Sequence, residues 1–134
     1  MTRTARVPVF ERVHTTRIVA TPAALDAARW PAGHIALRTA ADEVLITPPL
    51  AEPKVADEHA IVLADSSFFG GWIAAALALT VLERECEWEL PRARPAFAQG
   101  MVAGLPLKLW FESERVLVLV AGAVWPGLGG RFVA

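Results

Sequence analysis

The sequence is short of the residues that usually build metal and redox sites. Its 134 residues include one cysteine, Cys86, no tyrosine and three histidines, His14, His34 and His59. A single cysteine cannot form an internal disulfide, and a free thiol fits a reducing compartment. None of these four side chains has a second ligand at metal-binding spacing, so no metal site is predicted.

Motifs for nucleophilic catalysis and phosphate binding are also lacking. Asp65 precedes two serines, but no Gly-x-Ser-x-Gly elbow surrounds them, and we expect its carboxylate to accept backbone hydrogen bonds at a strand end. Cys86 is expected on the buried side of a helix, among glutamates that disfavour a thiolate nucleophile. The glycines of residues 127–130 precede no helix that could hold a phosphate. No catalytic residue is assigned.

Targeting and nucleic-acid signals are absent as well. No apolar segment follows residues 1–6, so no secretory signal is predicted. The longest weakly polar stretch, residues 68–82, is shorter than the roughly 20 residues of a membrane-spanning helix. The basic residues are scattered and do not alternate with exposed aromatics, which disfavours nucleic acid as a partner. We expect a cytoplasmic protein that binds neither membrane nor nucleic acid.

Apolar residues, in contrast, are abundant. They make up 54% of the chain, and the mean hydropathy is +0.41. A domain of this length leaves part of its apolar surface exposed, where it tends to mark a partner surface. The overall charge of −1 conceals a segregation: residues 1–38 carry a net +4, residues 39–90 a net −8 and residues 91–134 a net +3.

The first half of the chain predicts several short strands and one helix. Residues 1–20 are Arg-rich and predict an arm or an edge strand. Thr21 and Pro22 suit the N-cap and first position of a helix, which ends near Trp30. Strands are predicted at 34–38 and 43–47, a polar loop at 48–58, a central strand buried on both faces at 60–64, and another strand at 68–73.

The second half predicts a helix followed by a meander. Residues 74–87 are rich in good helix formers, with apolar positions along one face. Strands are predicted at 98–103, 106–111 and 115–120, and an irregular tail at 122–134. The whole chain, 1–134, is therefore predicted to be a single α+β domain with a mostly antiparallel sheet and a main helix on one face.

Five tryptophans are the strongest sign of an interface, because tryptophan is enriched where proteins dock. Trp110 shares one side of its predicted strand with Lys108, opposite a row of apolar residues. The predicted interface residues are Trp110, Lys108, Arg12, Arg17 and Trp125.

Five stretches resemble the gamma subunit of heterotetrameric sarcosine oxidase. They are residues 36–46 (ALRTAADEVLI), 61–66 (IVLADS), 81–90 (VLERECEWEL), 93–97 (ARPAF) and 102–110 (VAGLPLKLW). The last two are the most specific, because order and spacing both agree. The resemblance spans residues 35–121 and implies a reduced form of the folate-binding aminomethyltransferase fold.

The resemblance implies an accessory role without catalytic residues. In that family the flavin and folate chemistry of one-carbon metabolism belongs to the larger subunits. We therefore expect this chain to bind no cofactor itself, to dock larger oxidase subunits that hold FAD, FMN or tetrahydrofolate, or to self-associate. Two alternatives stay open: a free-standing folate or small-ligand binding domain, and a small enzyme of unrecognised type.

Overall fold

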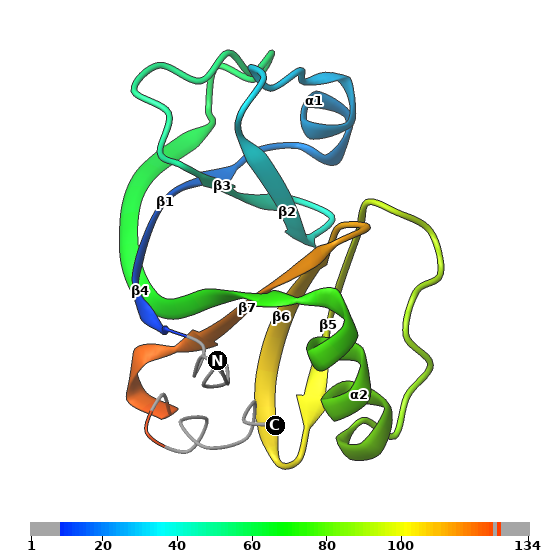
Figure 1. Ribbon diagram of the computed structural model, residues 1–134. Helices are drawn as coiled ribbons and strands as arrows, with labels where there is room; N and C mark the ends of the chain where they lie inside the picture. The colour runs from blue at the N-terminus through cyan, green and yellow to red at the C-terminus, as the bar shows by residue number, and fades with distance from the viewer. Residues whose placement is uncertain (1–8, 125, 127–134) are drawn as a thin grey trace. The chain divides into compact units, whose positions relative to one another are not determined.

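Two of the strands are long enough to contribute residues to both of the compact units that make up the chain. The computed structural model describes residues 9–124 and 126, and the chain divides into two compact units. Unit 1 contains residues 1–12 and 68–134, and unit 2 contains residues 13–67. Strands β1 (Glu11–Val19) and β4 (Ile61–Ala74) therefore each contribute to both units (Figure 1).

Unit 2 is an antiparallel sheet with one short helix. Its other elements are α1 (Pro22–Ala27), β2 (Ile35–Ala40) and β3 (Glu43–Thr47). β3 lies between β2 and β1, and β1 in turn neighbours β4. β1 is thus an interior strand rather than the predicted edge strand, because a strand lies on each side of it. Residues 48–60 connect β3 to β4 without a helix or strand.

The short helix α1 begins where its capping residues predict. The Thr21 hydroxyl accepts a hydrogen bond from the Ala24 backbone N–H at 3.2 Å, and Pro22 occupies the first helical position. The cap satisfies one of the free N–H groups of the first turn. Leu25 of this helix packs with Ile18 and Val44 in the apolar core of unit 2.

Unit 1 is a meander covered by the main helix. Its elements are α2 (Ala75–Glu85), β5 (Ala96–Val102), β6 (Leu105–Phe111), β7 (Arg115–Ala121) and the short 3₁₀ helix η1 (Gly122–Val124). The order β4-β7-β6-β5 is antiparallel throughout. Ala103 and Gly104, both with positive φ, form the tight turn between β5 and β6.

Alternating side chains of β6 and one face of α2 build the core of unit 1. Leu107, Leu109 and Phe111 are each at most 2% exposed, as the alternation in the sequence predicts. Val81 and Leu82 of α2 join the same cluster, which places the helix over this layer of strands (Figure 1). The five residues Val116–Val120 of β7 are all buried, as expected of a central strand.

The predicted strands at 60–64 and 68–73 are one continuous strand, β4. Asp65 and the two serines after it do not end the strand, because extended backbone accommodates them while their side chains are hydrogen-bonded. Gly71 permits a close approach: a Cβ there would collide with the backbone carbonyl of Val9. Gly71 therefore allows the segment before β1 to lie against β4 in unit 1.

The predicted fold class, α+β with a mostly antiparallel sheet and a main helix on one face, is confirmed. Predicted and observed boundaries of the main helix differ by two residues at most, and those of β3 coincide. Within the described part of the chain, no helix has the length and apolar character needed to cross a membrane. Of the predicted tail, only residues 122–124 and 126 are described.

Candidate functional site

The predicted interface residues Trp110 and Lys108 lie on the same side of β6 in unit 1. Both are half-buried. The Trp110 indole N–H donates to a Glu112 carboxylate oxygen at 3.0 Å, and the Lys108 ammonium donates to the Gln99 amide oxygen at 2.9 Å. These bonds fix the two side chains, so the amphipathic indole is held in place for contact with another surface.

The other predicted interface residues occupy different surroundings. The guanidinium of Arg12 stacks 4.8 Å from the ring centroid of Phe69 in unit 1. Arg17 belongs to unit 2 and is fully engaged in ion pairs, which are described below. Trp125 lies outside the described residues. The structure thus brings Trp110 and Lys108 together and gives Arg17 a structural role that the sequence did not predict.

An ion cluster ties three strands of unit 2 together. Arg17 of β1 donates from Nε and Nη2 to one Asp65 oxygen of β4, at 3.0 and 2.6 Å, and from Nη1 to Glu43 of β3 at 3.2 Å. The other Asp65 oxygen accepts from the backbone N–H and the hydroxyl of Ser67. Thr39 donates to the second Glu43 oxygen at 2.6 Å. Every carboxylate oxygen of the cluster therefore has a donor.

The cluster is built to keep Asp65 charged. Burial raises the pKa of Asp65, but hydrogen bonds from the side chain and backbone of Ser67 and the charge of Arg17 outweigh it, and the pKa lies below its usual value. A carboxylate stabilised in this way is a poor proton donor or base near neutral pH. Asp65 therefore fits a structural role, in which its ion pair with Arg17 holds β1 and β4 together. The predicted strand-end role of Asp65 is wrong in position, since the residue lies within β4.

A serine and a histidine also meet in unit 2. Nδ1 of His14 lies 2.8 Å from the Ser66 hydroxyl, although the two residues are 52 positions apart in sequence. A nucleophilic serine also needs an acid that orients the histidine and donors for the oxyanion. Among the described residues, no carboxylate bonds to the other nitrogen of this ring. No local sequence motif contains both residues, so the sequence alone does not predict that they are in contact.

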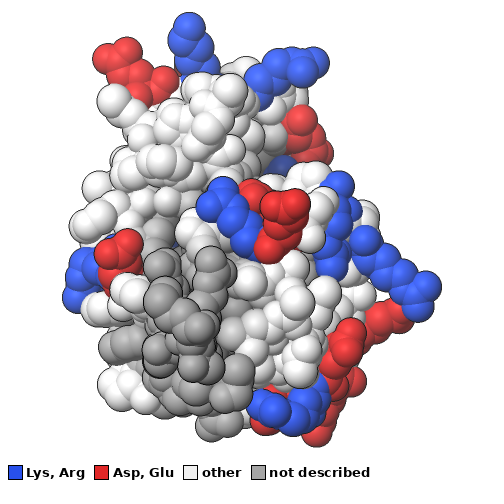
Figure 2. All heavy atoms as spheres, viewed as in Figure 1, with Lys and Arg blue, Asp and Glu red and all other residues white. Residues whose placement is uncertain are grey.

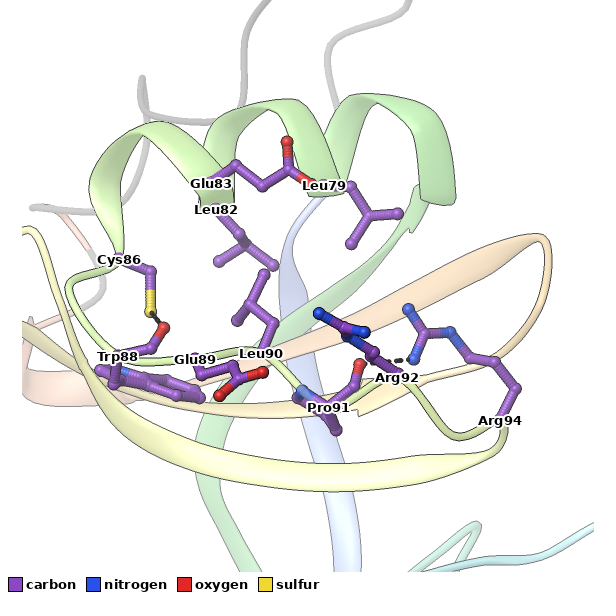
Figure 3. Close-up of a pocket in the computed structure, with 10 residues that line it drawn as sticks. All are labelled: Leu79, Leu82, Glu83, Cys86, Trp88, Glu89, Leu90, Pro91, Arg92 and Arg94. Carbon is purple, nitrogen blue, oxygen red and sulfur yellow. Dashed lines mark hydrogen bonds between the residues drawn. The ribbon is translucent and has the colours of Figure 1, made fainter.

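A pocket of about 490 Å³ lies in unit 1, between α2 and the segment that follows it (Figure 3). The segment is anchored to β5: the Trp88 indole N–H donates to the Met101 carbonyl at 2.8 Å, and its ring lies so close to Gly100 that a Cβ there would approach it to 2.9 Å. The Cys86 thiol donates to the Trp88 carbonyl at 3.3 Å. Cys86 is half-buried at the end of α2, and these contacts give it a structural role.

The pocket combines apolar walls with charges of both signs. Its lining residues are Leu79, Leu82, Glu83, Cys86, Trp88, Glu89, Leu90, Pro91, Arg92 and Arg94. Arg94 is held by the Pro91 carbonyl at 2.8 Å and stacks 5.0 Å from the Phe111 ring centroid. The exposed Arg92 side chain reaches into the space under α2 (Figure 3). The volume is in the range of small-molecule sites.

The first half of β4 exposes apolar side chains in unit 2. Ile61, Val62 and Leu63 are 53%, 45% and 52% exposed. The prediction of a strand buried on both faces at 60–64 is therefore wrong. Successive strand residues point to opposite faces, so this stretch is uncovered on both. The surface over it carries few charged atoms in the view of Figure 2.

No group of three or more potential metal-ligating side chains occurs among residues 9–124. The described charged residues are instead paired within each unit or spread over the surface, and both signs are interspersed on the face drawn in Figure 2.

No protein-family model and no curated protein matches the sequence. A solved structure does match: a chain of the heterotetrameric sarcosine oxidase from Corynebacterium sp. U-96, in complex with pyrrole 2-carboxylate. The superposition has a TM-score of 0.67 at 17% sequence identity, and it covers 93% of this chain and 81% of that chain. The two chains are thus of similar length. The likeness shows that this chain has the fold of a chain of a heterotetrameric sarcosine oxidase.

Proposed function

We propose that the protein is an accessory subunit, similar to the sarcosine oxidase gamma chain, that docks a larger flavin- or folate-dependent oxidase in the cytoplasm. The observation that carries the proposal is the fold match, which covers 93% of this chain and 81% of the sarcosine oxidase chain. The five sequence stretches that resemble the gamma subunit also support it. In this proposal FAD, FMN or tetrahydrofolate is held by the partner, and this chain supplies a docking surface.

The proposed docking surface is the side of β6 that carries Trp110 and Lys108. The indole and the ammonium are held by hydrogen bonds, so little side-chain freedom is lost when a partner covers them. Tryptophan at the centre of an interface commonly contributes about 2 kcal/mol or more to binding. A weakening of docking by about 30-fold or more is therefore expected when Trp110 is truncated to alanine.

The test is co-purification of the tagged chain from its native source. We expect a complex with a flavoprotein that shows oxidised-flavin absorbance and oxidises sarcosine or a related N-methyl amine. Trp110→Ala should lose the flavoprotein. The matched control Trp30→Ala should keep it, because Trp30 is also half-buried but packs against the apolar core of unit 2. A chain that purifies without any flavoprotein would contradict the proposal.

The pocket favours a second candidate function, the binding of folate or another small ligand. Its apolar walls beside Trp88 suit a planar molecule, and the Arg92 guanidinium suits a carboxylate on that molecule. Titration with tetrahydrofolate should quench tryptophan fluorescence, and Arg92→Ala should weaken the quenching. Glu87→Ala is a control, because Glu87 is exposed in the same segment and does not line the pocket. No quenching at millimolar ligand would rule this candidate out.

A further inference from the structure

Along its first half, β4 has an edge that no other strand occupies among the described residues. β4 pairs with β7 only from Phe68 to Ala74, while β1 lies on its other side. β7 ends at Ala121, where the chain turns into η1. Along residues 61–64, no other described strand therefore pairs with the β7 side of β4. An edge of this kind is a template for another strand.

This edge lacks the usual protection. Natural edge strands carry charges, prolines or bulges that prevent pairing with other chains. The terminal strands of the sheet are protected: β2 contains Arg38 and an irregular register, and on β5 the Met101 carbonyl accepts a hydrogen bond from the Trp88 indole. Residues 60–64 contain only Ala, Ile, Val and Leu. Ile61, Val62 and Leu63 are about half exposed and lie on both faces of the strand, so pairing with another strand would bury apolar surface on each face. Ala60, just before the strand, is half-buried.

We propose that residues 60–64 pair with the same segment of a second copy, antiparallel and about a two-fold axis at Val62. The segment is self-complementary in this register. Val62 faces its own copy, Ile61 faces Leu63, and Ala60 faces Ala64, which gives large–large pairs at the centre and small–small pairs at the ends. A two-fold interface requires such a patch, since each residue meets its counterpart from the same surface.

Charge is compatible with this register. Glu58, whose side chain is 87% exposed, would lie across from Ser66 of the second copy and not across from another acid. Few residues take part, far fewer than the 20–30 per side of a standard interface. The dimer is therefore expected to be reversible and to dissociate on dilution. The proposal goes beyond the accessory-subunit function and does not depend on it.

Sedimentation velocity of the full-length chain over a range of concentrations tests the proposal. We expect the wild type to shift from monomer to dimer as concentration rises. Val62→Lys should stay monomeric, because two ammonium groups would meet at the axis. Met101→Lys is the matched control: Met101 is an exposed apolar residue on the edge strand β5, 56% accessible against 45% for Val62. It should associate as the wild type does, and circular dichroism should show that both variants fold.

A covalent test covers the case in which Val62→Lys does not fold. In a Cys86→Ser background, Val62→Cys should form a disulfide-linked dimer under mild oxidation, since directly opposed residues of antiparallel strands have Cβ atoms about 4.5–5.5 Å apart. Met101→Cys in the same background should remain monomeric. A monomer at every concentration, a dimer unaffected by Val62→Lys, larger aggregates in place of a dimer, or a dimer disrupted by Met101→Lys would each overturn the proposal.

Discussion

Replacing Asp65 by asparagine tests whether the ion cluster of unit 2 stabilises the fold through its charge. The substitution keeps the shape and leaves an oxygen that can still accept from Ser67, but it removes the ion pair with Arg17. The Asp65 side chain is only 11% exposed and that of Arg17 is 32% exposed. Strands β1, β3 and β4 all contribute to the cluster, so its loss should loosen the whole sheet of unit 2.

The expected loss of stability follows from this partial burial. Exposed ion pairs contribute about 0.2–1 kcal/mol, and hydrogen bonds to charged groups contribute about 1.5–3 kcal/mol. Arg17 makes two short bonds to Asp65, so a loss of about 2 kcal/mol is expected at pH 7. With a urea m-value of about 2 kcal/mol per M, the unfolding midpoint should fall by about 1 M. Urea titration followed by circular dichroism measures it.

The effect should depend on pH with a definite sign. The pKa of Asp65 is lowered in the folded protein, so the carboxylate stabilises the fold above its unfolded pKa of about 3.9, and this stabilisation is lost as pH falls through the folded value. The difference between wild type and Asp65→Asn should therefore shrink below about pH 4. A difference that is the same at pH 3 and pH 7, or under about 0.5 kcal/mol at pH 7, would refute the reasoning. A double-mutant cycle with Arg17→Met isolates the pair itself.

Three further substitutions probe the packing of the two units. Phe111→Ala should destabilise by about 3–5 kcal/mol in urea titrations, because a fully buried ring is lost; a loss below about 1 kcal/mol would contradict the assigned core. Gly100→Ala should lower the melting temperature, because the added Cβ would clash with the Trp88 ring. In a background with Trp88→Ala, the same substitution should lower the melting temperature less. If the two decreases in melting temperature are simply additive, the clash is not the cause. Thr21→Ala should cost about 1 kcal/mol by calorimetry, whereas Thr21→Asn, which keeps a capping oxygen, should cost less.

Local patterns predicted the elements whose neighbours are close in sequence. The capping pair Thr21 and Pro22 locates α1, and the alternation from Leu107 to Phe111 identifies the buried side of β6. These signals depend on backbone geometry and on one periodic pattern, so they do not require knowledge of the rest of the fold. The hairpin formed by the strands predicted at 98–103 and 106–111 belongs to the same class.

The functional clusters could not be predicted in this way. Arg17 meets Asp65 across 48 positions, and His14 meets Ser66 across 52. Such contacts are set by the pairing order of the strands, which no single-sequence pattern specifies. The same limit explains why Arg17 was predicted to face a partner: its charge was visible in the sequence, and the two acids that bind it were not.

The exposed run in β4 shows what an apolar sequence does and does not determine. A continuous run of Ile, Val and Leu indicates a strand that is buried on both faces. It does not indicate whether the same chain or a second chain buries it. Isolated exposed apolar residues, such as Met101, are ordinary on protein surfaces. Three in succession on a free strand edge are not, because pairing and burial both remain available there. The apolar surplus of the sequence is therefore most informative at residues 61–63, which the described part of the chain leaves about half exposed.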